Sequence, residues 1–302
     1  MKKTITILFG LICCYSLMAQ DFTFALLTDT HISHKNKAPE EDLRKVIKEV
    51  NQNKDIEFVV VSGDISEEGD FKSLNQAKGL LDLINKKTYV IPGNHETKWT
   101  ESGMTDFSQI FGSERIKFKH NGFLFLGFNT GPLMRMADGH VVPQDITWLK
   151  EELEKEKETP TFLVTHYPLK DGDVDNWYDV TDAVRPYNIV TFLGGHYHSN
   201  RFFHYDGIPG IISRSTLRGK ENVVGYTIIT VKGNTLTVSE KRIGEEAKQW
   251  ASLDFSTKGY TLEGSTDKYP SYAVNSEYTN VQEKWVNRTG VGIYGSPAIY
   301  KS

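Results

Sequence analysis

The first third of the chain alternates between two hydrophobic patterns. Residues 22–27 and 56–61 are nearly continuous apolar runs, which is typical of strands covered on both faces. Apolar residues recur at helical spacing within 42–50 and 74–84, and a third apolar run occupies 89–91. This order of strands and helices predicts an α/β fold whose parallel sheet has right-handed crossovers.

The next part of the chain adds further strands. Residues 116–119 and 123–128 flank an Asn-Gly turn, which predicts a hairpin. A charged amphipathic helix is expected at 144–157, followed by buried strands at 161–164 and 189–193. Shorter alternating runs then predict antiparallel strands at residues 201–205, 210–213, 225–231 and 235–240.

Residues 1–20 have the features of an export signal. Lys2 and Lys3 precede an apolar stretch at 5–18, and Ala19 is a small residue at a plausible cleavage point. The apolar stretch is too short for a comfortable membrane span. We therefore expect a periplasmic or secreted mature chain without a transmembrane helix. A lipoprotein signal is the less favoured alternative, because the residue before Cys14 is not small in the usual sense.

Composition narrows the classes of function. The 302 residues are 38% hydrophobic and 25% charged, which is ordinary for a globular protein. The formal net charge of -4 gives no overall basic surface, so no stable complex with nucleic acid is expected. The only two cysteines, Cys13 and Cys14, lie in the export signal. The mature chain is therefore expected to lack disulfides and thiolate metal ligands.

Polar clusters follow five of the predicted strands. Because the carboxyl ends of parallel strands meet at one edge of a sheet, clusters far apart in sequence are expected to converge. Five of the nine histidines belong to these clusters, which a random scatter of surface histidines does not predict. Carboxylate, imidazole and amide ligands together suit Mn, Fe or Zn better than Mg or Ca. The clusters are Asp29-x-His31, Gly63-Asp64, Gly93-Asn94-His95-Glu96, His166 and Gly195-His196-x-His198.

This set of motifs resembles the calcineurin-like metallophosphoesterase superfamily over residues 22–240. The resemblance implies a four-layer α/β/β/α sandwich and two divalent or trivalent metal ions. Together with the export signal at 1–20, we expect a metallophosphoesterase domain at 21–245 and a β-rich or irregular C-terminal extension at 246–302. The implied ligands are Asp29, His31, Asp64 and His198 for one ion, and Asp64, Asn94, His166 and His196 for the other, with Asp64 as the bridge.

The same resemblance assigns two catalytic residues. His95 corresponds to the family histidine that protonates the leaving oxygen. Glu67 occupies the position of an acid that orients this histidine in the Ser/Thr phosphatases, so a contact between Glu67 and His95 is predicted. Glu68 replaces the phosphate-gripping arginine of those enzymes, which argues against a protein phosphatase. The stretch is closer to that of class III cyclic-nucleotide and related phosphodiesterases.

The implied activity is hydrolysis of phosphomonoesters or phosphodiesters by attack of a metal-bridging hydroxide. The substrate class is a small phosphate ester or a nucleotide. One alternative is an exported, non-catalytic metal-binding scaffold. Another is the phosphoesterase part of a larger propeller-containing protein, because residues 285–300 resemble the opening strands of a quinoprotein-like β-propeller blade. A β-rich tail that packs on the main domain is the plainer interpretation of this segment.

Substrate-contacting residues are left with two interpretations each. Trp177 or Tyr178 could stack on a base or simply pack locally. Arg214 and Arg218 follow a strand near the expected site and could contact phosphate or lie on the surface. Residues 250–280 lack a clear periodicity and are interpreted as a linker or a loosely packed appendage.

Overall fold

The computed structural model describes residues 21–132, 138–269, 280 and 282. The predicted export signal at 1–20 and the blade-like segment at 285–300 lie outside these residues. Within the described part of the chain, no helix combines the length and the apolar character that crossing a membrane requires.

The first of two mixed sheets contains the N-terminal strands. Its six strands have the order β12-β11-β10-β1-β2-β3. Strands β1, β2 and β3 are parallel, as the βαβαβ pattern predicts, while β10, β11 and β12 form an antiparallel meander beside β1. The bounds are β1 Phe22–Leu27, β2 Ile56–Ser62, β3 Lys87–Ile91, β10 Gly225–Lys232, β11 Thr235–Arg242 and β12 Lys248–Asp254.

The second sheet also has six strands, in the order β4-β5-β6-β7-β9-β8. The four central strands are parallel, and the edge strands β4 and β8 pair antiparallel with their neighbours. The predicted hairpin is therefore confirmed as β4 and β5. The bounds are β4 Ile116–His120, β5 Phe123–Gly127, β6 Thr161–Val164, β7 Ile189–Gly194, β8 Arg201–Tyr205 and β9 Ile208–Ile212.

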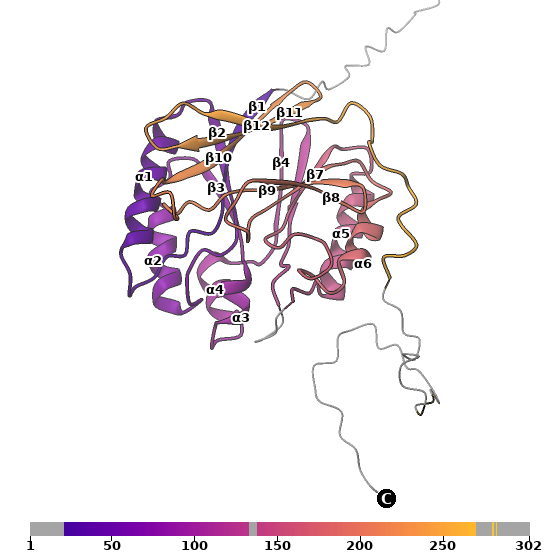
Figure 1. Ribbon diagram of the computed structural model, residues 1–302, viewed down its shortest axis with the longest axis horizontal. Helices are drawn as coiled ribbons and strands as arrows, with labels where there is room; N and C mark the ends of the chain where they lie inside the picture. The colour runs from indigo at the N-terminus through magenta and orange to yellow at the C-terminus, as the bar shows by residue number, and fades with distance from the viewer. Residues whose placement is uncertain (1–20, 133–137, 270–279, 281, 283–302) are drawn as a thin grey trace, which may run out of the picture.

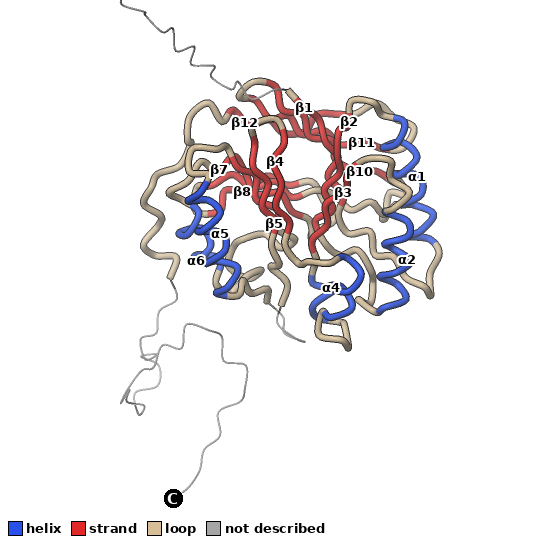
Figure 2. Tube along the Cα trace, turned by 180° about the vertical axis from the view of Figure 1, so that it is seen from behind, coloured by secondary structure: helices blue, strands red, loops and turns tan. Residues whose placement is uncertain are grey.

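Helices cover the outer faces of both sheets, which gives the predicted four layers (Figure 1). Helices α1 and α2 lie on the first sheet, and α5 and α6 lie on the second; Figure 2 shows the same layers from behind. Three buried apolar clusters fill the spaces between successive layers. The bounds are α1 Ala38–Gln52, α2 Phe71–Leu81, α3 Asn94–Lys98, α4 Thr105–Phe111, α5 Pro143–Lys155 and α6 Trp177–Val184.

Phenylalanines join the two sheets. Phe24 and Phe58 of the first sheet stack with centroids 4.9 Å apart, and Phe125 and Phe162 of the second stack at 4.8 Å. Phe24 and Phe125 meet edge to face across the interface at 5.6 Å. Each such pair contributes about 0.5–1.5 kcal/mol beyond the burial of its area. The sheets are thus fixed so that strand ends from both form one rim.

The linker interpretation is wrong for the start of the C-terminal extension. Residues of β12 pair antiparallel with β11, and Trp250 and Leu253 pack against the cluster between the sheets. The strand was missed because its alternation is imperfect, and the register shifts between Val238 and Ser239 of β11 opposite it. The predicted boundary at residue 245 consequently falls between two paired strands of one sheet.

Candidate metal centre

Three of the predicted ligands meet at the ends of β1 and β7. The Nε2 atom of His198 lies 3.1 Å from Oδ1 of Asp29 and 3.1 Å from Nε2 of His31. Oδ2 of Asp64, which follows β2, lies 3.8 Å from Nε2 of His31. We call the group Asp29, His31, Asp64 and His198 site 1.

The other predicted ligands form a second group, site 2, which consists of Asp64, Asn94, His166 and His196. Nε2 of His166 lies 3.2 Å from Oδ2 of Asp64 and 3.1 Å from Oδ1 of Asn94. Ligand atoms of Asp64, His166 and His196 all lie within 4.8 Å of one another. The structure therefore brings all seven predicted ligands together, with Asp64 between the two groups.

The backbone at these residues has an uncommon conformation. Asp29, His31 and Asp64 have φ angles of 52°, 45° and 48°. His196 and His198 have φ angles of 72° and 53°. Non-glycine residues seldom adopt this left-handed region, and such strain gathers at functional sites. Five of the seven predicted ligands are held in this way, which aims side chains from separate strand ends into one space.

Two glycines allow the strand ends to approach closely. A Cβ atom at Gly93 would lie 2.3 Å from the backbone nitrogen and from Oδ1 of Asp64. A Cβ atom at Gly195 would lie 1.9 Å from Oγ1 of Thr28 and 2.5 Å from Oδ2 of Asp29. The glycine that precedes each ligand motif is therefore required by the packing of the site itself.

Comparison with known proteins agrees with this geometry. The family model for calcineurin-like phosphoesterases matches residues 22–200, which is more than half of the chain. The chain belongs to the calcineurin-like phosphoesterase family. The match ends just after the last predicted ligand, His198, so it covers all seven predicted ligands of this family member.

Relatives of this calcineurin-like phosphoesterase include cyclic-nucleotide phosphodiesterases. It is 22% identical to the 3',5'-cyclic adenosine monophosphate phosphodiesterase CpdA of Vibrio vulnificus over 78% of this chain and 93% of the relative. It is 23% identical to the 3',5'-cyclic-nucleotide phosphodiesterase alr5338 of Nostoc, over 38% of this chain and only 42% of that protein.

Solved structures confirm the fold. A dimetal phosphatase from Danio rerio superposes with a TM-score of 0.61 at 15% identity, over 78% of this chain and 99% of that one. The purple acid phosphatase PPD1 of yellow lupin superposes with a TM-score of 0.59 at 12% identity, over 86% and 58% of the two chains. The α/β sandwich with two mixed sheets is therefore the family's architecture.

The side chains fit a pair of metal ions. Oδ1 of Asp29 is buried and accepts no hydrogen bond within the described structure. The Nε2 atoms of His31 and His198 point at each other, an arrangement that a shared cation would relieve. Carboxylates, imidazoles and one amide oxygen together form a donor set that suits metal ions. The phosphoesterase family and the chain's own geometry thus agree on a dinuclear site.

Electrostatics within the centre favour cations. Burial opposes ionisation of Asp29, yet the adjacent imidazoles of His198 and His31 hold the pKa of Asp29 well below its usual range. Burial likewise opposes protonation of His31, but the neighbouring carboxylates of Asp29 and Glu67 raise the pKa of His31 to about 10.

The pKa values of the two histidines of site 2 are shifted in opposite directions. Burial opposes protonation of His166, yet the charge of Asp64 raises the pKa of His166 to about 9. Burial lowers the pKa of His196 to about 4, with a further contribution from the charge of His166. Without metal, protons on His31 and His166 balance the buried carboxylates; a metal ion would take their place.

Several supporting residues were not recognised from the sequence. Nδ1 of His166 donates to the backbone carbonyl of Ser62 at 2.8 Å, and Oγ1 of Thr130 accepts from the backbone N–H of His166 at 3.2 Å. Oγ1 of Thr28 donates to Asp29 at 2.8 Å. Thr28 could have been noticed as the residue before the first ligand. Thr130 carries no such signal, because its partner is 36 residues away.

Glu96, the last residue of its cluster, connects two loops of the site. Its buried carboxylate accepts from the backbone N–H of Gly93 at 2.8 Å, and from the backbone N–H and hydroxyl of Ser66 at 2.9 and 3.0 Å. Burial raises the pKa of Glu96. The side chain therefore ties the loop after β3 to the loop after β2, which fixes Asn94 relative to Asp64.

The predicted contact between Glu67 and His95 exists through the backbone instead of the carboxylate. Nδ1 of His95 donates to the main-chain carbonyl of Glu67 at 2.5 Å. Oε2 of the Glu67 carboxylate instead lies 2.8 Å from Nδ1 of His31. The carboxylates of Asp29 and Asp64 favour the protonated form of His31, and this positive imidazole attracts the Glu67 side chain. Glu67 thus positions a predicted ligand, and its backbone alone orients His95.

His95 lies beside both sites. Its backbone N–H donates to Oδ1 of Asp64 at 2.9 Å, and its Nε2 lies 3.8 Å from Oδ2 of the same residue. Ring nitrogens of His95 and His31 also lie within 4.8 Å of each other. With Nδ1 engaged by Glu67, only Nε2 is free to face a substrate oxygen.

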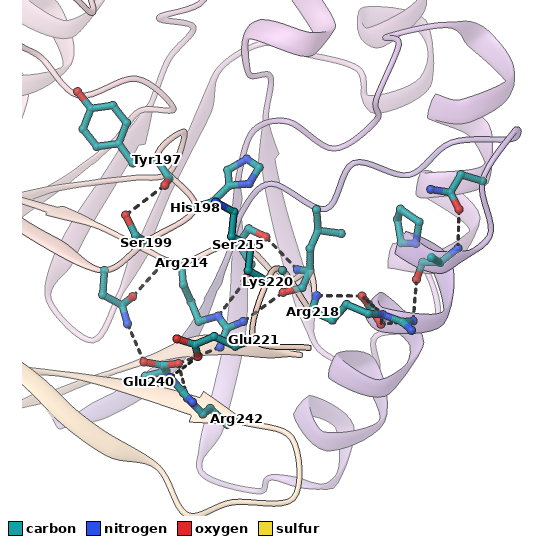
Figure 3. A pocket seen from close by; sticks show the side chains of 17 residues that line it. Tyr197, His198, Ser199, Arg214, Ser215, Arg218, Lys220, Glu221, Glu240 and Arg242 are labelled. Carbon is teal, nitrogen blue, oxygen red and sulfur yellow. Dashed lines mark hydrogen bonds and ion pairs between the residues drawn. The ribbon is translucent and has the colours of Figure 1, made fainter. Parts of the chain in front are cut away.

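A groove of about 890 Å³ borders His198 (Figure 3). Arg214 donates to Glu240 at 2.8 Å and to three backbone carbonyls, and Arg218 pairs with Asp42. Both guanidinium groups therefore build the walls of the groove. This arrangement favours a structural role for them over phosphate contact.

The two candidate stacking residues lie on α6, in the outer helical layer. Trp177 packs against the buried cluster beneath α6, and Tyr178 meets Tyr269 edge to face at 5.4 Å. Local packing is thus the interpretation that the structure supports for both rings.

Proposed function

We propose that this protein is a dinuclear metal-dependent phosphoesterase that hydrolyses small phosphodiesters or phosphomonoesters, with cyclic nucleotides as the first class to test. The observation that carries the proposal is the position of Asp64. Its Oδ2 lies 3.2 Å from His166 and 3.8 Å from His31, so one carboxylate serves both sites. The cyclic-nucleotide activity of the Vibrio and Nostoc relatives supports the choice of substrate class.

Different residues of the chain have different roles in the proposed reaction. A bound metal pair supplies an activated water and neutralises charge on the phosphoryl oxygens. The residues of site 1 and site 2, which follow strands of both sheets, would hold the two ions. His95 presents Nε2 beside Asp64, where it donates a proton to the leaving oxygen as a general acid. Glu67 keeps Nδ1 of His31 occupied, so that its Nε2 faces site 1.

The direct test is a substrate panel with metal analysis on the same sample. The purified chain is loaded with Mn²⁺ and assayed on an aryl phosphodiester, an aryl phosphomonoester and 3',5'-cyclic AMP. We expect turnover of at least one ester class and close to two metal ions per chain. Full metal loading without turnover on any of the three would favour the alternative of a non-catalytic scaffold.

We also propose that the chain is exported, on the pattern of charged, apolar and small residues within 1–20. Cell fractionation followed by N-terminal sequencing of the mature protein tests this. Recovery of the uncleaved chain from the cytoplasm would contradict export. The relation to a larger propeller-containing protein is tested separately, by searching the coding sequence downstream for further blade repeats.

A further inference from the structure

A tryptophan beside the proposed general acid is unusually exposed. Trp99 directly follows α3 and has 49% of its surface accessible. By contrast, Trp148, Trp177 and Trp250 pack against the apolar clusters of the fold. Trp99 belongs to none of the three clusters that the described residues form. A large apolar ring left in water next to a reaction centre has no evident role in stability.

The ring is placed by its spacing from His95. Residues four apart share one face of a helix, so the short helix α3 brings Trp99 next to His95. The two ring centroids are 6.3 Å apart, with an angle of 66° between the planes. Because Nδ1 of His95 is held by the carbonyl of Glu67, the imidazole cannot turn freely away from this arrangement. Trp99 therefore borders the position where His95 meets a leaving oxygen.

A lysine side chain lies against the Trp99 ring, and a cavity lies nearby. Nζ of Lys98 lies 5.0 Å from the centroid of the Trp99 ring, and Lys98 has no ion-pair partner in the part of the chain that the structure describes. A cavity of about 690 Å³ is lined by Lys98 and Thr100, the neighbours of Trp99 in sequence, and also by the carboxylates of Glu101, Glu114 and Asp145. The exposed ring of Trp99 and the cation of Lys98 beside it suit a ligand that is both anionic and ring-bearing.

We propose that Trp99 is a substrate-contacting residue that stacks on the ring of the ester's organic part. It would make the enzyme selective for phosphoesters of nucleosides over phosphoesters of simple alcohols. This inference rests on the proposed function, because it uses His95 to place the leaving oxygen. A nucleobase offers a π-face of the right kind, and such stacking tolerates different bases.

Kinetics of three variants test the selectivity. Trp99→Ala, Trp99→Phe and the control Leu83→Ala are compared with the wild type on 3',5'-cyclic AMP and on glycerol phosphate. Leu83 is equally exposed, at 51%, but follows the far end of α2. We expect Trp99→Ala to lower kcat/KM roughly 5- to 150-fold on the nucleotide alone, mainly through KM. Trp99→Phe should recover most of this loss. Leu83→Ala should leave kcat/KM unchanged on both substrates.

Binding provides a readout that does not depend on turnover. Calorimetry compares 5'-AMP with ribose 5-phosphate, both titrated into Mn²⁺-loaded protein. The wild type should prefer 5'-AMP, and Trp99→Ala should lose that preference. If turnover is absent but the preference depends on Trp99, the ring site stands and the phosphoesterase proposal fails. If turnover is present but Trp99→Ala retains full nucleotide preference in both assays, the role of Trp99 is refuted.

Discussion

Nδ1 of His166 lies 2.8 Å from the backbone carbonyl oxygen of Ser62. His166 follows β6 of the second sheet and Ser62 ends β2 of the first, so this hydrogen bond joins the two sheets at the metal centre. It also places the proton on Nδ1 and turns Nε2 toward Asp64 and Asn94, as a metal ligand requires. The bond between the sheets and the assembly of the site are therefore one structural feature.

His166→Ala should abolish this arrangement. We expect loss of the ion at site 2 and a fall in kcat of more than about 100-fold, beyond the usual effect of removing an outer partner of a ligand. Elemental analysis and activity measured on one sample check the result. His204→Ala is the matched control, because His204 is exposed on β8. Equal metal content in both variants would show that His166 is not a ligand.

Gly195→Ala should damage the centre without altering any polar group. The new Cβ would lie 1.9 Å from Oγ1 of Thr28, so Asp29 and its loop must shift. We expect a loss of about 1–3 kcal/mol in the free energy of unfolding, together with weaker metal binding. Thermal unfolding and metal titration measure the two effects.

Gly79→Ala provides the opposite case. Gly79 lies inside α2, and an added Cβ there meets no atom within 4 Å. This variant should gain about 0.5–1 kcal/mol in stability, because alanine restricts the unfolded chain more than glycine. Its metal affinity should match that of the wild type. Equal stability and equal metal affinity of Gly79→Ala and Gly195→Ala would contradict the steric argument for Gly195.

His95→Ala and Glu67→Gln should separate chemistry from ligand positioning. We expect His95→Ala to lower kcat by about 10²- to 10⁴-fold while both metal ions remain bound. Glu67→Gln should weaken metal affinity about 10- to 100-fold, because the carboxylate holds His31. At saturating Mn²⁺ its kcat should stay close to the wild-type value, since the backbone carbonyl still orients His95. A large loss of kcat at saturating metal would mean that the carboxylate acts on His95 after all.

The positions of the ligands could be predicted because the chemistry follows directly after buried strands. The apolar run before Gly93-Asn94-His95 predicts a strand, and the polar residues mark where that strand ends. Since the ends of parallel strands lie at one edge of the sheet, the polar residues that follow them are expected to lie together. The four layers follow from the same alternation. None of this required knowledge of individual side-chain contacts.

What could not be predicted depends on three-dimensional neighbours. Glu67 could reach either His31 or His95 from the same loop, and the choice is set by the surrounding carboxylates. Thr130 acts on a residue of a different strand. Strand β12 lies at a sheet edge and none of its residues is fully buried, so its period-two pattern is weak. Local pattern is strong where burial is complete and weak where a contact has several candidates.

Metal uptake should release protons. With pKa values raised to about 10 and about 9 from an ordinary 6.5, His31 and His166 are both protonated in the metal-free protein at pH 7. A metal ligand must be unprotonated, so binding displaces both protons. Because His31 belongs to site 1 and His166 to site 2, each ion displaces one proton, and the apparent affinity of each site should rise about tenfold between pH 7 and 8. Calorimetry in buffers of different ionisation enthalpy counts the protons directly.

The stability of the metal-free protein should fall as pH rises, whereas its affinity for metal should increase. A histidine whose folded pKa is raised contributes stability that is complete below pH 6.5 and is lost as pH rises through 9 to 10. The metal-free chain should therefore become less stable over that interval, while the Mn²⁺-loaded chain binds its ions more tightly. Thermal unfolding with and without a chelator, repeated at several pH values, measures this divergence. Parallel pH profiles for the two forms, with no protons released on binding, would show that His31 and His166 are neutral before metal arrives.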